Sequence, residues 1–183
     1  MGEARARASV PAVTTEFEAT ARGEAMFREL QWVHSMVRRD LAVVEQLAAE
    51  VADGLGGEEV EAALAELKTG GPLWQLKVNC LRYCRFVHSH HGAEDVLLFP
   101  ALRAANPALG PVVDRLEADH RRVSDLLDAV EAAARALNGT AGEAARARVV
   151  DALQELHAHL LEHLDYEERS AGPTIRTLDG LRG

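Results

Sequence analysis

The stretch HHGAEDVLLFP, residues 90–100, has a counterpart in HLDYEERSAGP, residues 163–173. In both stretches a histidine is followed four residues later by a glutamate, and that glutamate is followed six residues later by a proline. Residues four positions apart lie about 40° apart around an α-helix, so the histidine and the glutamate share one helix face. Each stretch therefore predicts a helix that presents an imidazole and a carboxylate to the same neighbour.

A second repeated pattern precedes each of these stretches in the sequence. The residues Leu, His, Val, Leu, Val and Glu recur at the same spacing in residues 30–45 and 116–131. His34 and His120 lie in the middle of the two apolar stripes that this spacing creates. The chain therefore reads as two helix pairs of one design, and we expect approximate twofold symmetry with polar groups at the centre.

Clusters of glycine and proline divide the chain into helical segments. We expect long helices over about 22–53, 73–105, 111–138 and 142–170, and a short helix over 58–68. No β-hairpin signal interrupts this pattern. The predicted class is all-α: an antiparallel up-down-up-down four-helix bundle with a short extra helix between the first two long helices.

Length and composition narrow the class of protein. The 183 residues suit one domain, with a lead-in over 1–20, a bundle over 21–178 and a tail over 179–183. The net charge of −9 disfavours a nucleic-acid binder. Cys80 and Cys84 cannot form a disulfide framework, and we expect them to pack in the core.

No apolar run is long enough to span a bilayer, and the first residues lack the pattern of a secretory signal. We therefore expect a cytoplasmic protein that binds neither nucleic acid nor membrane, as a monomer or a weak homo-oligomer.

Helical geometry directs five histidines and two glutamates toward the bundle axis. They are His34, His90, Glu94, His120, His159, His163 and Glu167. The second long helix is expected to turn Asn79, Tyr83, Phe86, His90, Glu94 and Leu97 inward, which leaves His88 and His91 off its inward face. His157 lies off the inward face of the fourth long helix. Asp95 and Glu168 either face outward or accept hydrogen bonds from the ligands.

These groups require a cation among them. An unpaired buried charge costs several kcal/mol, against a total stability of about 5–15 kcal/mol. Imidazole and carboxylate ligands suit iron, zinc, manganese or nickel. Seven groups are too many for one tetrahedral zinc but fit two metals bridged by the two glutamates.

The ordered pattern of His, HxxxE, His and HxxxE resembles the hemerythrin-like family of HHE cation-binding domains. The resemblance covers about residues 22–176. It implies a four-helix bundle around a non-haem di-iron centre that handles O₂ or its relatives. Carried over, it makes His34, His90, His120 and His163 the terminal ligands and Glu94 and Glu167 the bridges.

The third long helix departs from this resemblance. Oxygen-carrying members have a HxxxH pair there and HxxxxD on the fourth helix, whereas this chain has Ser124 four residues after His120, and HxxxE at His163. These differences argue against reversible O₂ carriage. In an antiparallel pair of helices, His159 would lie level with Ser124, so we expect His159 to replace the missing histidine.

These observations predict a non-haem di-iron protein that binds or reacts with O₂, peroxide or NO, in sensing, storage or detoxification. Tyr83 and Tyr166 lie near the inward arcs and are candidate hydrogen-bond donors to a bound oxygen species. Two alternatives stay open: a di-iron oxidoreductase, either a catalase-like peroxidase or an oxygenase acting on a small organic substrate, and an iron-handling protein. Manganese, or a mixed Fe/Mn pair, suits the same ligands.

No separate cofactor motif is present, so electrons for turnover would come from an electron-donor protein or a small reductant.

Overall fold

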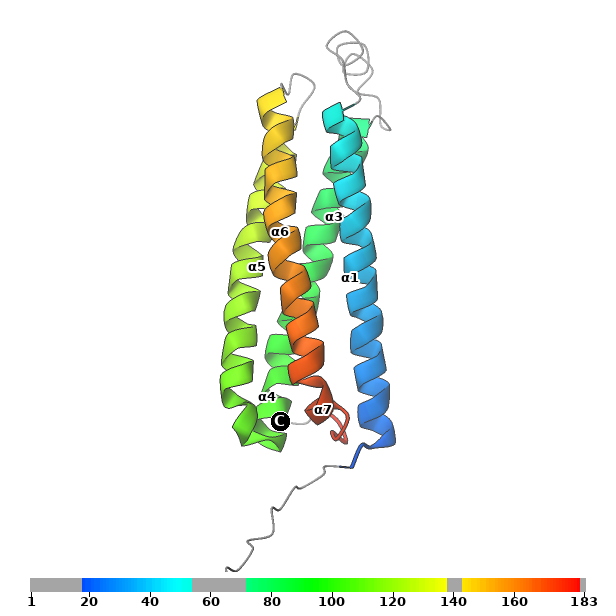
Figure 1. The fold of residues 1–183 in the computed structure, drawn as a ribbon, viewed down its shortest axis with the longest axis vertical. Coiled ribbons are helices and arrows are strands. Elements are labelled where there is room, and N and C mark those ends of the chain that lie inside the picture. The colour runs from blue at the N-terminus through cyan, green and yellow to red at the C-terminus, as the bar shows by residue number, and fades with distance from the viewer. Residues whose placement is uncertain (1–17, 54–71, 138–142, 182–183) are drawn as a thin grey trace, which may run out of the picture.

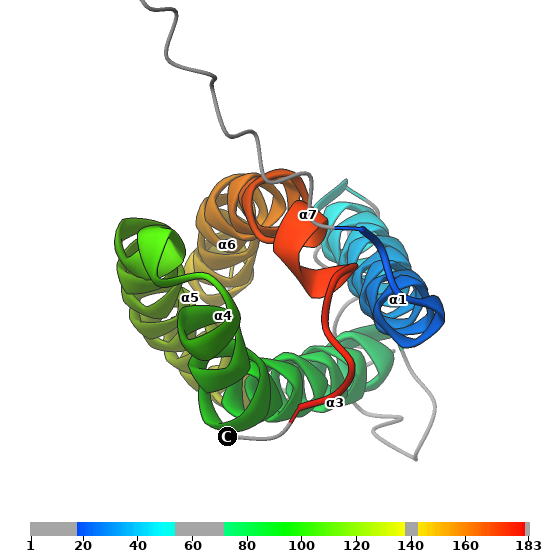
Figure 2. The ribbon, with the colours of Figure 1, turned by 90° about the horizontal axis from the view of Figure 1, so that it is seen from below.

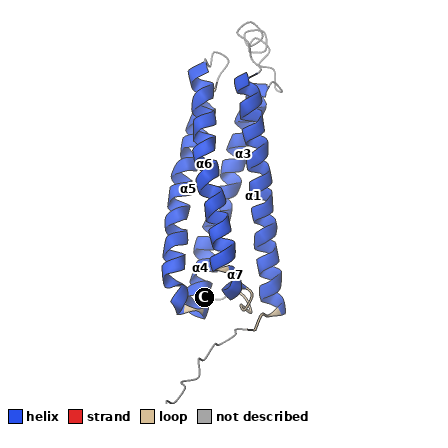
Figure 3. Cartoon of the chain, in the orientation of Figure 1, coloured by secondary structure: helices blue, strands red, loops and turns tan. Residues whose placement is uncertain are grey.

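The structure, a computed structural model, describes residues 18–53, 72–137 and 143–181. Its long helices lie side by side along one axis (Figure 1); they are α1 (Ala21–Asp53), α3 (Pro72–Ala93), α5 (Gly110–Ala136) and α6 (Glu143–Ser170). The shorter elements are the π-helix η1 (Glu94–Leu98), α4 (Phe99–Ala105), the 3₁₀ helix η2 (Pro107–Leu109) and α7 (Gly172–Ile175). The part of the chain that is described contains no strand (Figure 3), which confirms the all-α class. The predicted helix over 58–68 lies outside this part.

The four long helices form a ring when the molecule is seen end on (Figure 2). Helix α1 packs against α3 and α6, and α5 packs against the same two helices from the other side. The colour gradient in Figure 1 shows that successive long helices run in opposite directions. None of the described helices is both long and apolar enough to cross a membrane.

Apolar residues at helical spacing explain why these segments are helices and how they pack. On α5, buried side chains recur every three or four residues, which places them on one side of the helix. They are Val113, Leu116, His120, Val123, Leu126, Leu127, Val130 and Ala134.

The core consists of two apolar clusters with a polar layer between them. One cluster includes Val37, Leu127 and Leu160, and the other includes Leu30, Phe99 and Leu116. On α1 and α5, the residue between the two clusters is a buried histidine, His34 or His120. Apolar packing above and below therefore holds these imidazoles at one level of the bundle.

The buried face of α3 differs from the predicted one by one residue. Phe86 and Leu97 are 36% and 50% exposed, whereas Val87, His91 and Leu98 are buried. The prediction was right for Tyr83 and Glu94 but wrong for Phe86, Leu97 and His91, because it centred the inward face on His90. Beside Tyr83, the buried residues recur at alternating intervals of four and three: Cys80, Cys84, Val87, His91, Glu94 and Leu98.

Both thiols pack in this core as expected. Cys80 and Cys84 are free and buried, and burial raises the pKa of each to about 12.

The π-helix η1 lies where Pro100 disturbs the backbone ladder. Proline has no N–H to donate and cannot be fitted into an undistorted helix interior. The helical path nevertheless continues from α3 through η1 into α4, where Pro100 occupies the first turn. A single π turn is a known response to such a disturbance and is frequent at functional sites. Glu94 is the first residue of this turn.

The C-terminal segment closes one end of the bundle against the start of α1. The Thr20 hydroxyl accepts from the backbone N–H of Gly23 and donates to the Leu178 carbonyl, both at 2.8 Å. The Thr20 N–H also donates to the Arg176 carbonyl at 2.8 Å. A Cβ at Gly23 would lie 2.1 Å from that carbonyl oxygen, so only glycine allows the two backbones to approach this closely.

We expect Gly23→Ala to separate α1 from the segment after α7 and to lower the free energy of unfolding by about 1–3 kcal/mol, the usual cost of overpacking. Chemical denaturation measures this change. Gly110→Ala is the matched control, because a Cβ there meets nothing within 4 Å. Equal stability of the two variants would show that the close approach at Gly23 does not hold the C-terminal segment in place.

Candidate metal centre

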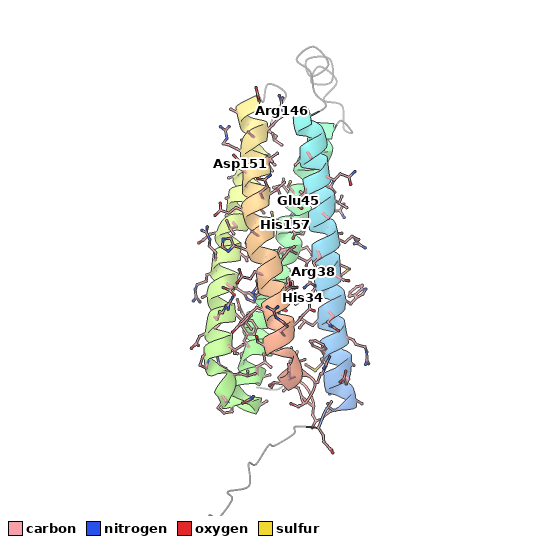
Figure 4. The ribbon with its side chains drawn as sticks, in the orientation of Figure 1. His34, Arg38, Glu45, Arg146, Asp151 and His157 are labelled. Atoms are coloured by element: carbon pink, nitrogen blue, oxygen red, sulfur yellow. The ribbon has the colours of Figure 1, made fainter. Side chains whose placement is uncertain are left out.

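Seven buried or nearly buried polar side chains form the layer between the two apolar clusters. They are His34 from α1, His90 and His91 from α3, Glu94 from η1, His120 from α5, and His163 and Glu167 from α6. His34 and Glu167 are fully inaccessible to solvent. Figure 4 shows His34 and Arg38 on α1 where this helix borders α6. All four long helices thus contribute to one polar layer, with Glu94 following directly on α3.

The layer divides into two groups of potential metal ligands that share Glu94. The two-histidine group is His34, His90 and Glu94; the three-histidine group is His91, Glu94, His120 and His163. Within each group the candidate ligand atoms all lie within 4.8 Å of one another, close enough to surround one cation.

Glu94 lies between the groups with one oxygen toward each. Its Oε1 is 3.3 Å from His90 Nε2 and 3.8 Å from His34 Nε2. Its Oε2 is 3.5 Å from His120 Nε2. This is the arrangement that a carboxylate needs to bridge two cations.

Glu167 occupies a second position between the groups. Its Oε2 is 3.4 Å from His34 Nε2 and 3.9 Å from His163 Nε2. Two carboxylates therefore border both sets of imidazoles.

The polar atoms that face the centre of the layer have few partners. Among the described residues, the buried nitrogen and oxygen atoms without a hydrogen bond include both oxygens of Glu94 and of Glu167. They also include the Nε2 atoms of His34, His90 and His91. Since buried polar atoms are normally satisfied, these atoms fit a site built to hold cations.

On their other side, two of the imidazoles are held by carboxylates. His120 Nδ1 donates to Asp95 at 2.8 Å, and His34 Nδ1 donates to Glu168 at 2.9 Å. Of the two roles open to Asp95 and Glu168, the structure therefore shows the accepting one. Such a bond fixes the ring and turns Nε2 toward the centre of the layer, where His120 Nε2 lies 3.2 Å from His163 Nε2.

Glu168 is itself anchored by a cation. Its Oε1 accepts from Arg38 Nη1 at 2.8 Å, while Arg38 Nη2 donates to Asp165 at 2.7 Å. The hydrogen bonds from His34 and Arg38 lower the pKa of Glu168 to about 2.

Burial and charge together set the protonation of the layer. Burial, assisted by the neighbouring imidazoles, lowers the pKa of His90 to about 3 and that of His120 to about 2. Both rings are therefore neutral near pH 7, which is the form that binds metals. Burial, with the charge of Glu167, raises the pKa of Glu94 to about 8.

His34 differs from the other imidazoles. Burial alone would lower its pKa, but the nearby carboxylates of Glu167, Glu168 and Glu94 outweigh burial and raise it to about 10. The carboxylates of the layer thus stabilise positive charge at its centre. In the absence of a metal, a proton on His34 supplies part of that charge.

The structure brings together six of the seven residues predicted for the site: His34, His90, Glu94, His120, His163 and Glu167. His159 is exposed, so its predicted inward position is wrong; it lines a small pocket, of about 40 Å³, which His163 also borders. The buried side of α6 runs through Leu156, Leu160 and Leu164, and His159 lies beyond the edge of this seam.

His91 of α3, rather than His159 of α6, is the fifth histidine of the layer. Its ring stacks on that of His120 with the centroids 4.1 Å apart. Consecutive residues point about 100° apart on a helix. His90 can therefore approach His34 on α1 while His91 approaches His120 on α5. The sequence analysis missed His91, although the regular spacing of Cys84, Val87, His91 and Leu98 could have identified it.

The predicted tyrosines do not join this layer in the described contacts. Tyr83 is buried beside a cavity whose lining includes Asp40 and Phe86 but no member of the layer. Tyr166 packs on the apolar cluster that includes Leu30 and Phe99, and the Arg115 guanidinium lies 3.8 Å above its ring.

Besides the small pocket at His163, two larger cavities reach the layer from different sides. The polar cavity, of about 360 Å³, lies between α3 and α5 and is bordered by His91 and His120. The apolar cavity, of about 220 Å³, lies between α1 and the α3–η1 segment and is bordered by His90 and Glu94. Each ligand group thus has its own route to the surface.

The placement of His91 and His159 yields a matched pair of variants. We expect His91→Ala to weaken metal binding at least tenfold, since even loss of a residue that orients a ligand costs about 10–100-fold. His159→Ala should leave the metal content per chain unchanged, because that side chain is exposed. Elemental analysis of both proteins distinguishes the roles, and metal loss confined to His159→Ala would reverse our assignment.

A bound metal should also stabilise the fold. A ligand present at a hundred times its dissociation constant stabilises by about 2.7 kcal/mol, which corresponds to a rise in Tm of about 5–10 °C for a domain of this size. Thermal unfolding with anaerobic Fe²⁺, and again with a chelator, measures this shift. A double variant, Glu94→Ala with Glu167→Ala, should show no such rise. An equal response of both proteins would place the metal elsewhere.

Comparison with known protein families gives one match. The family model described as the hemerythrin HHE cation-binding domain matches residues 26–175. A search of curated proteins and a search of solved structures find no match.

Proposed function

Because the chain belongs to the hemerythrin HHE cation-binding family, we propose that it holds two iron ions and binds or reacts with O₂, peroxide or NO. The observation that carries this proposal is the position of Glu94. One of its oxygens faces His34 and His90, and the other faces His120. One residue thus belongs to two potential cation sites, which favours a bridged pair over a single ion.

In this proposal the two-histidine group holds one ion and the three-histidine group holds the other. Glu94 and Glu167 bridge them. Neither group contains a thiolate, and imidazole nitrogen with carboxylate oxygen is a ligand set typical of non-haem iron. When bound, the iron pair supplies the electrons and the coordination positions that O₂, peroxide or NO requires.

The residues of the chain position and insulate this centre. Asp95 and Glu168 fix the rings of His120 and His34 through their Nδ1 atoms. Arg38 keeps Glu168 ionised and in place. The apolar clusters above and below shield the layer along the bundle axis, which strengthens its internal electrostatics.

The apolar cavity favours small uncharged ligands at the two-histidine group. Most of its lining is aliphatic, including Leu30, Val33 and Leu98. Diatomic molecules such as O₂ and NO partition into such surroundings more readily than charged molecules do.

The same cavity supports a second candidate function, oxidation of a small organic substrate. Its volume of about 220 Å³ exceeds what a diatomic molecule fills. An engineered cavity of about 150 Å³ already binds benzene. An aromatic or aliphatic molecule next to His90 and Glu94 would lie close enough to a bound metal to be its substrate.

The metal content, together with an optical titration, tests the proposed function. The protein is loaded with iron, reduced without air and mixed separately with O₂, H₂O₂ and NO. We expect two irons per chain and a ligand-to-iron absorption band in at least one of these mixtures. Glu94→Ala should lower the iron content, because it removes the shared ligand. One zinc per chain, or no iron, would contradict the proposal.

The fate of the optical band separates the candidate functions. A band that disappears when O₂ is removed indicates reversible binding, and H₂O₂ consumed over many turnovers indicates a peroxidase- or catalase-like activity. A single turnover that becomes repeated only when an apolar organic molecule is added indicates the oxidase or oxygenase.

A further inference from the structure

The histidines of the polar layer differ in what holds their outer ring nitrogens. His34 Nδ1 donates to Glu168 at 2.9 Å. In the same way, His120 Nδ1 donates to Asp95 at 2.8 Å. His163 Nδ1 is also buried, but it has no hydrogen-bond partner among the described residues. Because a ligand histidine is normally held by such a partner, His163 is the exception among these three rings.

A carboxylate nevertheless faces His163 Nδ1. The Oδ2 atom of Asp119, on α5, lies 3.9 Å from this nitrogen, which is about 1 Å too far for a hydrogen bond. The Asp119 side chain is 31% exposed, and Arg115 Nε lies 3.5 Å from the same oxygen. Asp119 and His163 both border the small pocket of about 40 Å³. A small movement of an accessible side chain would therefore close the gap.

The proton positions in the layer account for this gap. A neutral imidazole carries one proton, on either Nδ1 or Nε2. His120 donates from Nδ1, so its Nε2 can only accept. The 3.2 Å contact between the two Nε2 atoms then gives His163 Nε2 the donor role, which leaves His163 Nδ1 without a proton. An unprotonated nitrogen and a carboxylate oxygen have no hydrogen to share, in agreement with their 3.9 Å separation.

The first half of the chain has no equivalent of this carboxylate. A shift of 73 residues takes His90 onto His163, and a shift of 86 residues takes Val33 onto Asp119. Val33 borders the apolar cavity together with His90. Where the second half offers His163 an acceptor, the first half offers His90 an aliphatic side chain. Asp119 is therefore particular to the three-histidine group and is not part of the repeated design.

We propose that Asp119 is the positioning residue of His163, and that its carboxylate accepts a hydrogen bond from His163 Nδ1 once a metal is bound at Nε2. In that exchange the proton on Nε2 leaves to solvent and Nδ1 takes one up, so the charge of the ring does not change. The bond fixes the ring and makes it a stronger ligand. This inference rests on the proposed function, because it requires His163 to be a metal ligand.

Asp119→Val tests the assignment, because it gives position 119 the residue of the equivalent position 33. Glu162→Val is the matched control. Glu162 borders the same small pocket and pairs with the same Arg115, at 2.8 Å, but forms no hydrogen bond or ion pair with His163 within the described part of the chain. Asp119→Asn keeps the shape of the side chain without its charge, and serves if Asp119→Val does not fold.

NMR of protein labelled with ¹⁵N-histidine locates the ring proton of His163, whose signals a His163→Gln variant assigns. Spectra are compared for the metal-free protein and for the protein loaded with Zn²⁺, a diamagnetic metal that the same ligands suit. We expect the proton on Nε2 without metal and on Nδ1 with zinc. Exchange of this Nδ1 proton with water should be at least tenfold faster in Asp119→Val than in the wild type, and unchanged in Glu162→Val.

Competition with a chelator measures the affinity of each protein for Fe²⁺ without air. We expect Asp119→Val to weaken binding by about 10–100-fold, the usual cost of removing the partner of a ligand histidine. Glu162→Val should match the wild type.

An Nδ1 proton that exchanges equally fast in the wild type and in Asp119→Val would overturn the inference while leaving the proposed function intact. A proton already on Nδ1 in the metal-free protein would also overturn it. An equal loss of affinity in Glu162→Val would do so too, because it would trace the effect to Arg115. Failure of the wild-type protein to bind iron would instead overturn the proposed function, and this inference with it.

Discussion

Two carboxylates and five imidazoles share one buried level of this bundle, and the remainder of the structure is arranged around that constraint. Uncompensated, a set of this kind would consume a large part of the stability of a small domain, since each buried ion costs several kcal/mol against a total of about 5–15 kcal/mol. The buried oxygens of Glu94 and Glu167 have no hydrogen-bond partner among the described residues, and the proton on His34 balances only part of their charge. A cation balances the remainder, and the apolar clusters on both sides keep the ligands in position before one binds.

The twofold repeat explains why the site has matching ligands from both halves of the chain, and differences between the halves explain its asymmetry. Two copies of a helix pair supply matching ligands, and each half holds an imidazole of the other through Asp95 or Glu168. The copies are not identical, however. His91 has Leu164 as its equivalent, so one group gains a third histidine.

The helices and most of the site could be predicted from the sequence, because both depend on local periodicity. The boundaries of the long helices and the convergence of His34, His120 and Glu94 depend on spacing along single helices. The choice between His91 and His159 depends instead on the rotation of α3 and α6 relative to the bundle axis. Their packed seams set that rotation: Leu160 and Leu164 turn His159 outward, and Val87 and Leu98 turn His91 inward.

Local sequence patterns also could not predict contacts between segments that lie far apart in the chain. The close approach of Gly23 to the Arg176 carbonyl and the placement of Tyr166 under Arg115 arise from packing of the finished bundle. Neither has a signature at short range in the sequence.

The central claim is that Glu94 joins two cation sites rather than bordering one. Anomalous X-ray diffraction from crystals of the iron-loaded protein, measured at the iron absorption edge, tests it most directly. Our account predicts two iron peaks, one beside His34 and His90 and the other beside His91, His120 and His163, with the Glu94 carboxylate between them. A single peak, or a peak beside the exposed His159, would contradict it.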